Sequence, residues 1–275
     1  MTKFVSDCSC DLHSIQGVNF TAVPLTISSD HFHFTDDENL DIHFFLNTLA
    51  GYKGRSYTAC PGVEDWLKAY EGADELYVTP LTSLLSGSYN SAMVAAEQYC
   101  QEHPKAKIMV FDTLTTGPEL RLLIEKLVAL KQSGSTFEEI CAAGKEYLKH
   151  TRLFFAFKSL HNFAQNGRVN KAVAAAVGVL GISILGTASE EGNIAPRSKC
   201  RGEKKVISEL LSMLEEAGYQ GGKLRICHIE NEPFATKVAN AISEKFGTSD
   251  SLVYPAAGLC SYYGERGGII LGCES

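Results

Sequence analysis

Short apolar runs alternate along the chain with segments in which apolar side chains recur every three to four residues. The short runs at residues 3–6, 75–79 and 107–111 carry the β-branched and aromatic side chains that are typical of strands. The periodic segments at residues 86–102 and 118–131 are typical of amphipathic helices. Strands that alternate with helices in this way predict an α/β fold with largely parallel sheets.

The same reasoning assigns the rest of the chain. We predict further helices over residues 41–50, 61–70, 137–149, 160–165, 171–179, 203–217 and 233–246. We predict further strands over residues 20–27, 31–34, 153–157, 182–187, 194–199, 224–229, 251–254 and 267–272. Two turns, at residues 28–30 and 190–193, predict hairpins. The pattern repeats from Leu153 onward, which predicts two α/β domains, residues 1–152 and 153–275.

Composition narrows the classes of partner. The chain has 275 residues, 45% hydrophobic and 21% charged, with a net charge of −7, which is typical of a globular protein. An acidic chain lacks the basic surface that nucleic acid requires, so we expect no nucleic-acid partner. The N-terminus MTKFVSD does not resemble a signal peptide, and no apolar run reaches the length of a membrane span. We therefore expect a cytoplasmic protein without stable membrane insertion.

The cysteines predict neither disulfides nor a metal site. There are nine of them, an odd number, and without an export signal we expect reduced, mostly buried thiols. Only Cys8 and Cys10 are close in sequence, and a structural zinc site needs paired C-x-x-C spacings. His31 and His33 share one face of a predicted strand, but no carboxylate cluster accompanies them. We expect no metal and no cofactor.

The most informative segment is the hydroxyl-rich run TPLTSLLSGSYNSA at residues 79–92. A predicted strand ends and a predicted helix begins within it. Ser86 occupies the position of an N-cap, and Gly87 leaves the backbone open to close approach. The free N–H groups of the first turn and the helix dipole favour an anion at such a place. The alternative is that these serines only cap the helix.

Two other polar residues could contribute to an anion site. Thr58 lies in RSYTACP, residues 55–61, directly before a predicted helix. Arg168 lies in NGRV, residues 166–169, where a guanidinium could reach a carboxylate or phosphate. The alternatives are a turn or cap residue for Thr58 and a solvated surface side chain for Arg168.

No catalytic motif accompanies these residues. The chain has no G-x-S-x-G nucleophile elbow, no P-loop and no G-x-G-x-x-G segment. Cys60 or Ser86 could act as a nucleophile only if the fold brought a histidine to it, and nothing in the sequence requires that. We therefore predict no catalytic residues.

Taken together, the motifs resemble those of the DegV family, which includes the fatty-acid-binding subunits of bacterial fatty acid kinase. The resemblance runs nearly end to end. The segment SLLSGSYNSA at residues 83–92 is similar to the family's S-x-L-S-G-T-Y-x-S-A and is the most specific match. The other matches are SDCSCDL at residues 6–12, TACP at 58–61, SL through GRV at 159–169, and KCRG at 199–202.

The resemblance implies a two-domain fold with mostly parallel sheets and an acyl-chain tunnel between the domains. It implies a protein that is not an enzyme itself, but holds a long-chain fatty acid and presents its carboxylate to a fatty acid kinase partner. The ligand-binding residues it implies are Thr58, Ser83, Ser86, Gly87, Ser88 and Arg168. The alternative is an enzyme or binding protein that acts on another small amphiphilic carboxylate or phosphate ester.

One segment departs from the family pattern. Family members end in a G-x-H-x-G-P-G segment whose histidine reaches the ligand head group, and here the sequence is GLCSYYGERG at residues 258–267. Tyr262 takes the place of the histidine, so we expect its phenol to lie near the carboxylate and donate a hydrogen bond. The alternative is that Tyr262 packs between strands and that Tyr263 or Arg266 faces the ligand.

Overall fold

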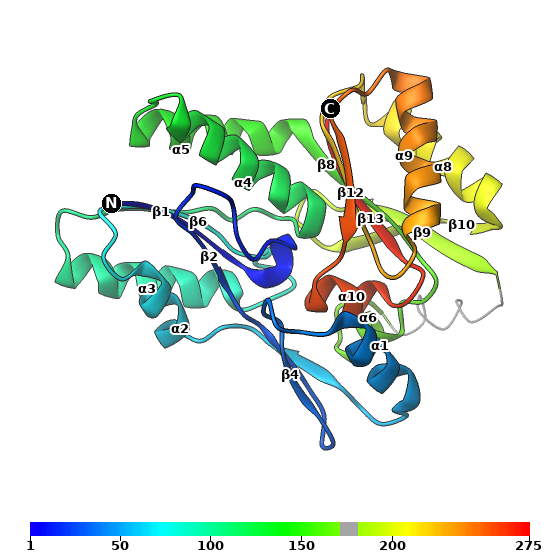
Figure 1. The fold of residues 1–275 in the computed structure, drawn as a ribbon, viewed down its shortest axis with the longest axis horizontal. Helices are drawn as coiled ribbons and strands as arrows, with labels where there is room; N and C mark the ends of the chain where they lie inside the picture. Colours follow the sequence, from blue (N-terminus) through cyan, green and yellow to red (C-terminus); the bar gives the residue numbers. More distant parts are fainter. Residues whose placement is uncertain (171–180) are drawn as a thin grey trace.

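The computed structural model describes residues 1–170 and 181–275, which form three sheets and the helices around them (Figure 1). The predicted helix at residues 171–179 lies outside the described residues. Most other predicted helices and strands are present within a few residues of the expected bounds. No helix in the described part of the chain is both long and apolar enough to cross a membrane.

The first sheet is parallel throughout and has the order β2-β1-β6-β7. Its strands are β1 (Thr2–Asp7), β2 (Phe20–Val23), β6 (Glu75–Thr79) and β7 (Lys107–Val110). Successive side chains of a strand point to opposite faces. Val5 and Val78 therefore pack on α2 (Val63–Tyr70) and α3 (Ser88–Glu102), while Phe4 and Tyr77 pack on α4 (Gly117–Gln132) and α5 (Phe137–Tyr147). The sheet lies between two helical layers (Figure 1).

The second sheet has six strands in the order β10-β9-β8-β13-β11-β12. They are β8 (Thr151–Phe157), β9 (Ile182–Ala188), β10 (Ile194–Arg201), β11 (Leu224–His228), β12 (Ser251–Pro255) and β13 (Ile269–Glu274). Only the β11–β12 pair is parallel, so the expectation of mostly parallel sheets holds for the first sheet and not for this one. Helices α8 (Glu203–Glu216) and α9 (Glu232–Phe246) cover one face.

The third sheet is small and antiparallel, with the order β4-β3-β5. It consists of β3 (Thr26–Ser28), β4 (His33–Thr35) and β5 (Tyr57–Ala59). Together with α1 (Ile42–Gly51), α6 (His161–Gln165) and α10 (Gly258–Gly264), it covers the other face of the six-stranded sheet. Ile27 and Phe45 thus share one apolar core with Phe155, although they come from the first fifth of the chain.

Several expectations are corrected by the fold. The predicted strand at residues 20–27 is two strands in two different sheets, because Pro24 between them has no N–H to donate to a ladder. Helix α3 begins at Ser88 with Gly87 as its N-cap, two residues later than predicted. Both predicted hairpins, β3–β4 and β9–β10, are confirmed. Strand β8 begins at Thr151, and the division into domains 1–152 and 153–275 stays a prediction.

Candidate functional site: a cavity between the two larger sheets

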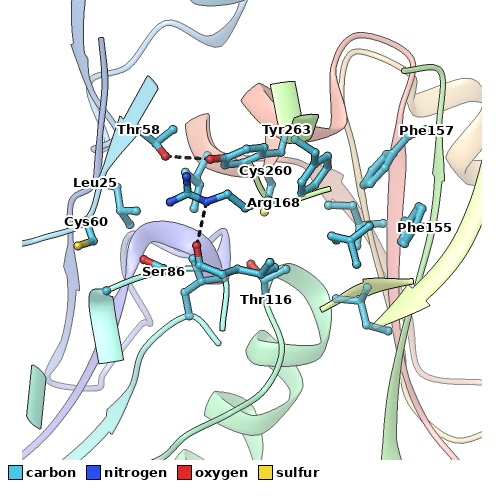
Figure 2. Close-up of a pocket in the computed structure, with 18 of the residues that line it drawn as sticks. Leu25, Thr58, Cys60, Ser86, Thr116, Phe155, Phe157, Arg168, Cys260 and Tyr263 are labelled. Atoms are coloured by element: carbon cyan, nitrogen blue, oxygen red, sulfur yellow. Dashed lines mark hydrogen bonds between the residues drawn. The ribbon is translucent and has the colours of Figure 1, made fainter. Parts of the chain in front are cut away.

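A cavity of about 250 Å³ lies between the loops at the carboxyl end of the parallel sheet and the inner face of the six-stranded sheet (Figure 2). In the parallel sheet, β2 lies on one side of β1 and β6 and β7 lie on the other. Ligands of open α/β sheets bind where the strand order reverses in this way. The cavity lining comprises Leu25, Thr58, Ala59, Cys60, Leu81, Leu85, Ser86, Gly87, Thr116, Leu153, Phe155, Phe157, Phe163, Arg168, Ile194, Leu259, Cys260, Tyr263 and Ile270.

One wall of the cavity is apolar and rich in aromatic rings. Leu153, Phe155 and Phe157 lie on the same face of β8 because they are two residues apart along the strand. The rings of Phe155 and Phe157 stack with their centroids 4.6 Å apart, and Phe163 on α6 stacks on Phe157 at 5.8 Å. This wall offers an apolar chain a surface without hydrogen-bonding groups.

The polar groups of the cavity gather away from that wall (Figure 2). The hydroxyls of Thr58 and Tyr263 lie 2.9 Å apart. Nε of Arg168 donates to the carbonyl oxygen of Leu85 at 3.1 Å, and Oγ of Ser86 accepts a hydrogen bond from the backbone N–H of Ser88 at 3.2 Å. Burial is the main cause that raises the pKa of Tyr263, so its phenol is neutral at physiological pH.

The charge of Arg168 favours an anion in this place. Within residues 1–170 and 181–275, no carboxylate lies within ion-pair distance of its guanidinium, which contacts backbone carbonyl groups of Leu85 and Asn166 instead. A half-buried cation without a counter-ion is stabilised by a carboxylate or phosphate that can accept its N–H groups.

The N-terminus of α3 adds a second attraction for negative charge. Its N-cap residue, Gly87, makes no side-chain cap, and of the first-turn N–H groups that of Ser88 bonds Oγ of Ser86. A Cβ at Gly87 would lie 3.2 Å from Sγ of Cys60, tighter than ordinary van der Waals contact. A glycine here keeps open the space between the helix and the loop that follows β5.

Four of the seven predicted ligand residues, Thr58, Ser86, Gly87 and Arg168, line the cavity, and three, Ser83, Ser88 and Tyr262, do not. Oγ of Ser83 donates to a carboxylate oxygen of Asp112 at 2.7 Å. The hydroxyl of Ser88 donates to the buried carboxylate of Asp7, which also accepts the backbone N–H of Leu81. Ser83 and Ser88 therefore hold the hydroxyl-rich loop in place from outside the cavity.

Tyr262 lies outside the cavity as well, contrary to the expectation that its phenol reaches the ligand. Its side chain is fully buried, and its hydroxyl lies 2.7 Å from Oγ of Ser56 and 3.0 Å from Nδ2 of Asn166. Tyr263 faces the cavity instead, which was the alternative, because consecutive residues of α10 point about 100° apart. Arg266 pairs with Glu230 at the surface and does not line the cavity.

Several lining residues carried no signal in the sequence. Leu25, Thr116 and Cys260 come from loops and from a helix that the pattern did not predict. The alternation of Leu153 and Phe155 along a predicted strand was the one available signal, because it marks a shared apolar face.

Two buried carboxylates hold α10, the helix that carries Tyr263. Asp36 accepts the backbone N–H groups of Gly258 and Leu259, each at 2.7 Å, and Asp11 accepts that of Ala257 at 2.8 Å. Burial raises the pKa of both carboxyls, that of Asp11 to about 7. The opening segment of the chain thus positions a helix some 250 residues later, as the contact between Asp11 and Ala257 shows.

No cluster of three or more histidine, cysteine or acidic side chains able to hold a metal occurs among the described residues. His33, one of the two candidate histidines, has its Nδ1 2.8 Å from Oγ of Ser28.

The lining of the cavity provides hydrogen-bond donors, the guanidinium of Arg168 and an apolar wall. These groups fit an amphiphilic anion.

Comparison with known proteins identifies the family. The family model described as an uncharacterised protein of the DegV family matches residues 1–269. The chain belongs to the DegV family. It is 38% identical over 276 residues to a DegV domain-containing protein of Streptococcus gordonii, an alignment that covers 99% of this chain and 98% of the relative.

Two solved structures share the whole fold of this DegV protein. A DegV family protein from Eubacterium eligens, loaded with heptadecanoic acid, is 53% identical with a TM-score of 0.98 and full coverage of both chains. The fatty acid kinase B3 protein of Streptococcus pneumoniae, loaded with linoleic acid, is 37% identical with a TM-score of 0.97. That match covers 100% of this chain and 99% of the other.

Proposed function

We propose that this DegV protein is a cytoplasmic carrier that holds a long-chain fatty acid in the cavity and presents its carboxylate to a fatty acid kinase partner. The observation that carries the proposal is the segregation of the cavity lining. Arg168, Thr58 and Tyr263 form a polar group, whereas Phe155 and Phe157 form an apolar wall away from it (Figure 2). This distribution matches a molecule that has one charged end and a long hydrocarbon chain.

The acyl chain packs along the aromatic wall. Each methylene removed from water contributes about 0.8 kcal/mol to binding. The stacked rings of Phe155, Phe157 and Phe163 are held by the sheet and by α6, so little ordering is needed when the ligand enters.

The carboxylate binds at the polar group, where donors replace its lost contacts with water. Thr58 and Tyr263 can each turn a hydroxyl proton toward the ligand, Arg168 supplies the positive charge, and Ser86 and Gly87 bring the N-terminus of α3. Hydrogen bonds to an ionised acceptor are roughly twice as strong as those between neutral groups.

The kinase role rests on the similar protein from Streptococcus pneumoniae, which is named a fatty acid kinase B3 protein and holds linoleic acid. In this proposal the present chain binds the fatty acid without any cofactor, and the partner supplies nucleotide binding and phosphoryl transfer. The chain carries no P-loop of its own.

The test combines the purified protein, linoleic acid, ATP and a fatty acid kinase catalytic subunit, and measures the acyl phosphate formed. We expect acyl phosphate only when both proteins are present. Protein that binds linoleic acid but supports no acyl phosphate with any catalytic subunit would limit the function to fatty acid binding. Acyl phosphate made by this chain alone would contradict the carrier role.

A further inference from the structure

The hydroxyl of Tyr262 joins two segments that are distant in sequence. It lies 2.7 Å from Oγ of Ser56, 206 residues earlier, and 3.0 Å from Nδ2 of Asn166, 96 residues earlier. The Tyr262 side chain is fully buried and does not line the fatty acid cavity. Any effect of this phenol on a ligand must therefore act through the residues it holds.

Each partner of Tyr262 stands two residues before a polar residue of the cavity. Ser56 precedes Thr58, which lies in β5, and Asn166 precedes Arg168, which follows α6. The Asn166 carbonyl also accepts a hydrogen bond from the Arg168 guanidinium. The hydrogen bonds of the Tyr262 hydroxyl thus connect the segment that carries Thr58 to the segment that carries Arg168.

The neighbouring tyrosine strengthens the same connection. Tyr263 contacts Thr58, so two consecutive residues of α10 hold two hydroxyls that are two residues apart on one segment. The α6 side is tied to α10 as well, because Nδ2 of Asn162 donates to the carbonyl oxygen of Tyr262 at 2.7 Å. Helix α10 therefore contacts both sides of the polar group.

We propose that Tyr262 is a positioning residue that fixes the placement of Thr58 relative to Arg168, and so tunes the affinity for the ligand carboxylate without touching it. The inference rests on the proposed fatty acid binding. A carboxylate accepts short hydrogen bonds in defined directions, so a displacement of either donor weakens its binding while leaving the acyl chain's contacts in place.

The test substitution should leave the fold intact. In Tyr262→Phe, Ser56 keeps its contacts with Oε1 of Gln165 at 3.1 and 3.3 Å, and Nδ2 of Asn166 keeps the carbonyl oxygen of Asn162 at 2.9 Å. Neither partner is left without a hydrogen bond. Tyr219→Phe is the matched control, because it removes another buried phenol, which contacts Gly222 and Thr248 away from the cavity.

The experiment measures affinities of delipidated protein for linoleic acid and for methyl linoleate, which has the same chain and no carboxylate, by displacement of a fluorescent fatty acid. We expect Tyr262→Phe to weaken binding of the acid about 3- to 10-fold and to change binding of the ester by less than about 2-fold. Tyr219→Phe should change neither. Ser56→Ala removes the hydroxyl that contacts the Tyr262 phenol and should reproduce the acid-selective loss.

Other outcomes distinguish a failure of the role inferred for Tyr262 from a failure of the proposed fatty acid binding. An equal loss for acid and ester in both Tyr262→Phe and Ser56→Ala would overturn the inference, because the effect would then be a general disturbance of the cavity. Unchanged affinity for the acid would overturn it too. Wild-type protein that binds neither probe would instead overturn the proposed function, and this inference with it.

Discussion

The phenol oxygen of Tyr263 lies 2.9 Å from Oγ1 of Thr58 and closes the polar end of the cavity between α10 and β5. Either atom can donate, so one hydroxyl donates to the other and the second hydroxyl keeps its proton for another acceptor. A carboxylate placed between them and Arg168 accepts both protons and gains a cation. The contact therefore marks the place where the proposed ligand's charged end replaces a protein–protein hydrogen bond.

The hydroxyls of the polar group should contribute measurably to affinity. We predict that Thr58→Val and Ser86→Ala each weaken fatty acid binding by about 1.5–3 kcal/mol, the cost of losing a hydrogen bond to a charged group. Ser83→Ala is the control, because Ser83 belongs to the same hydroxyl-rich loop but contacts Asp112 outside the cavity. Titration calorimetry of the three variants checks this. Equal effects of Ser83→Ala and Ser86→Ala would remove Ser86 from the ligand contacts.

The contribution of the Tyr263 hydroxyl can be measured by itself, because Tyr263→Phe keeps the ring and its packing on Phe163. We predict that Tyr263→Phe weakens fatty acid binding by about 0.5–1.5 kcal/mol. Thermal melting of the unliganded variant should stay close to that of the wild type, since Thr58 is half-buried and can turn to water. A variant that binds fatty acid as tightly as the wild type would show that the phenol does not reach the carboxylate.

Asp11 should make stability depend on pH. Burial raises the pKa of its carboxyl from the ordinary range of an aspartate to about 7, and Oδ2 has no hydrogen-bond partner among residues 1–170 and 181–275. Between these values the folded state keeps a proton that the unfolded state has lost, so Asp11 makes folding less favourable as pH rises, up to about pH 7. Asparagine lacks this ionisation and tolerates the left-handed backbone of this position, where φ is 55°.

We therefore predict that Asp11→Asn gains stability relative to the wild type between pH 5 and pH 8, by about 1–3 kcal/mol. Urea unfolding of both proteins at the two pH values checks this, and the difference between them cancels the other titrating groups. A stability difference that stays constant across this range would show that Asp11 does not retain its proton in the folded protein.

The pattern of apolar residues predicted most of the helices and strands, because the formation of each depends on residues that are close in sequence. The short apolar runs of β1 and β6 and the apolar periodicity of α4 were sufficient to assign them. The break at Pro24 was missed because apolar residues continue on both sides of it. Helix α10 was missed because the N–H groups of Gly258 and Leu259 are satisfied by Asp36, more than 220 residues away.

Some residues of the candidate site could be predicted from their chemistry. The orientation of the two tyrosines on α10 could not. Thr58, Ser86 and Arg168 line the cavity, and hydroxyls and a cation beside helix ends had made them candidates for an anion site; their contact with a ligand stays a prediction. The choice between Tyr262 and Tyr263 depends on a rotation of about 100° along α10, and without the position of that helix the sequence carries no such information.

The most direct test of the central claim is the identity of any small molecule bound to the protein purified from a bacterial host. Organic extraction and mass spectrometry should find about one fatty acid per chain, with roughly 14 to 18 carbons, a length that is typical of ligands of this family. The double variant Thr58→Val/Arg168→Met, purified in the same way, should carry much less. Wild-type protein that carries no fatty acid and cannot be loaded with one would contradict the account.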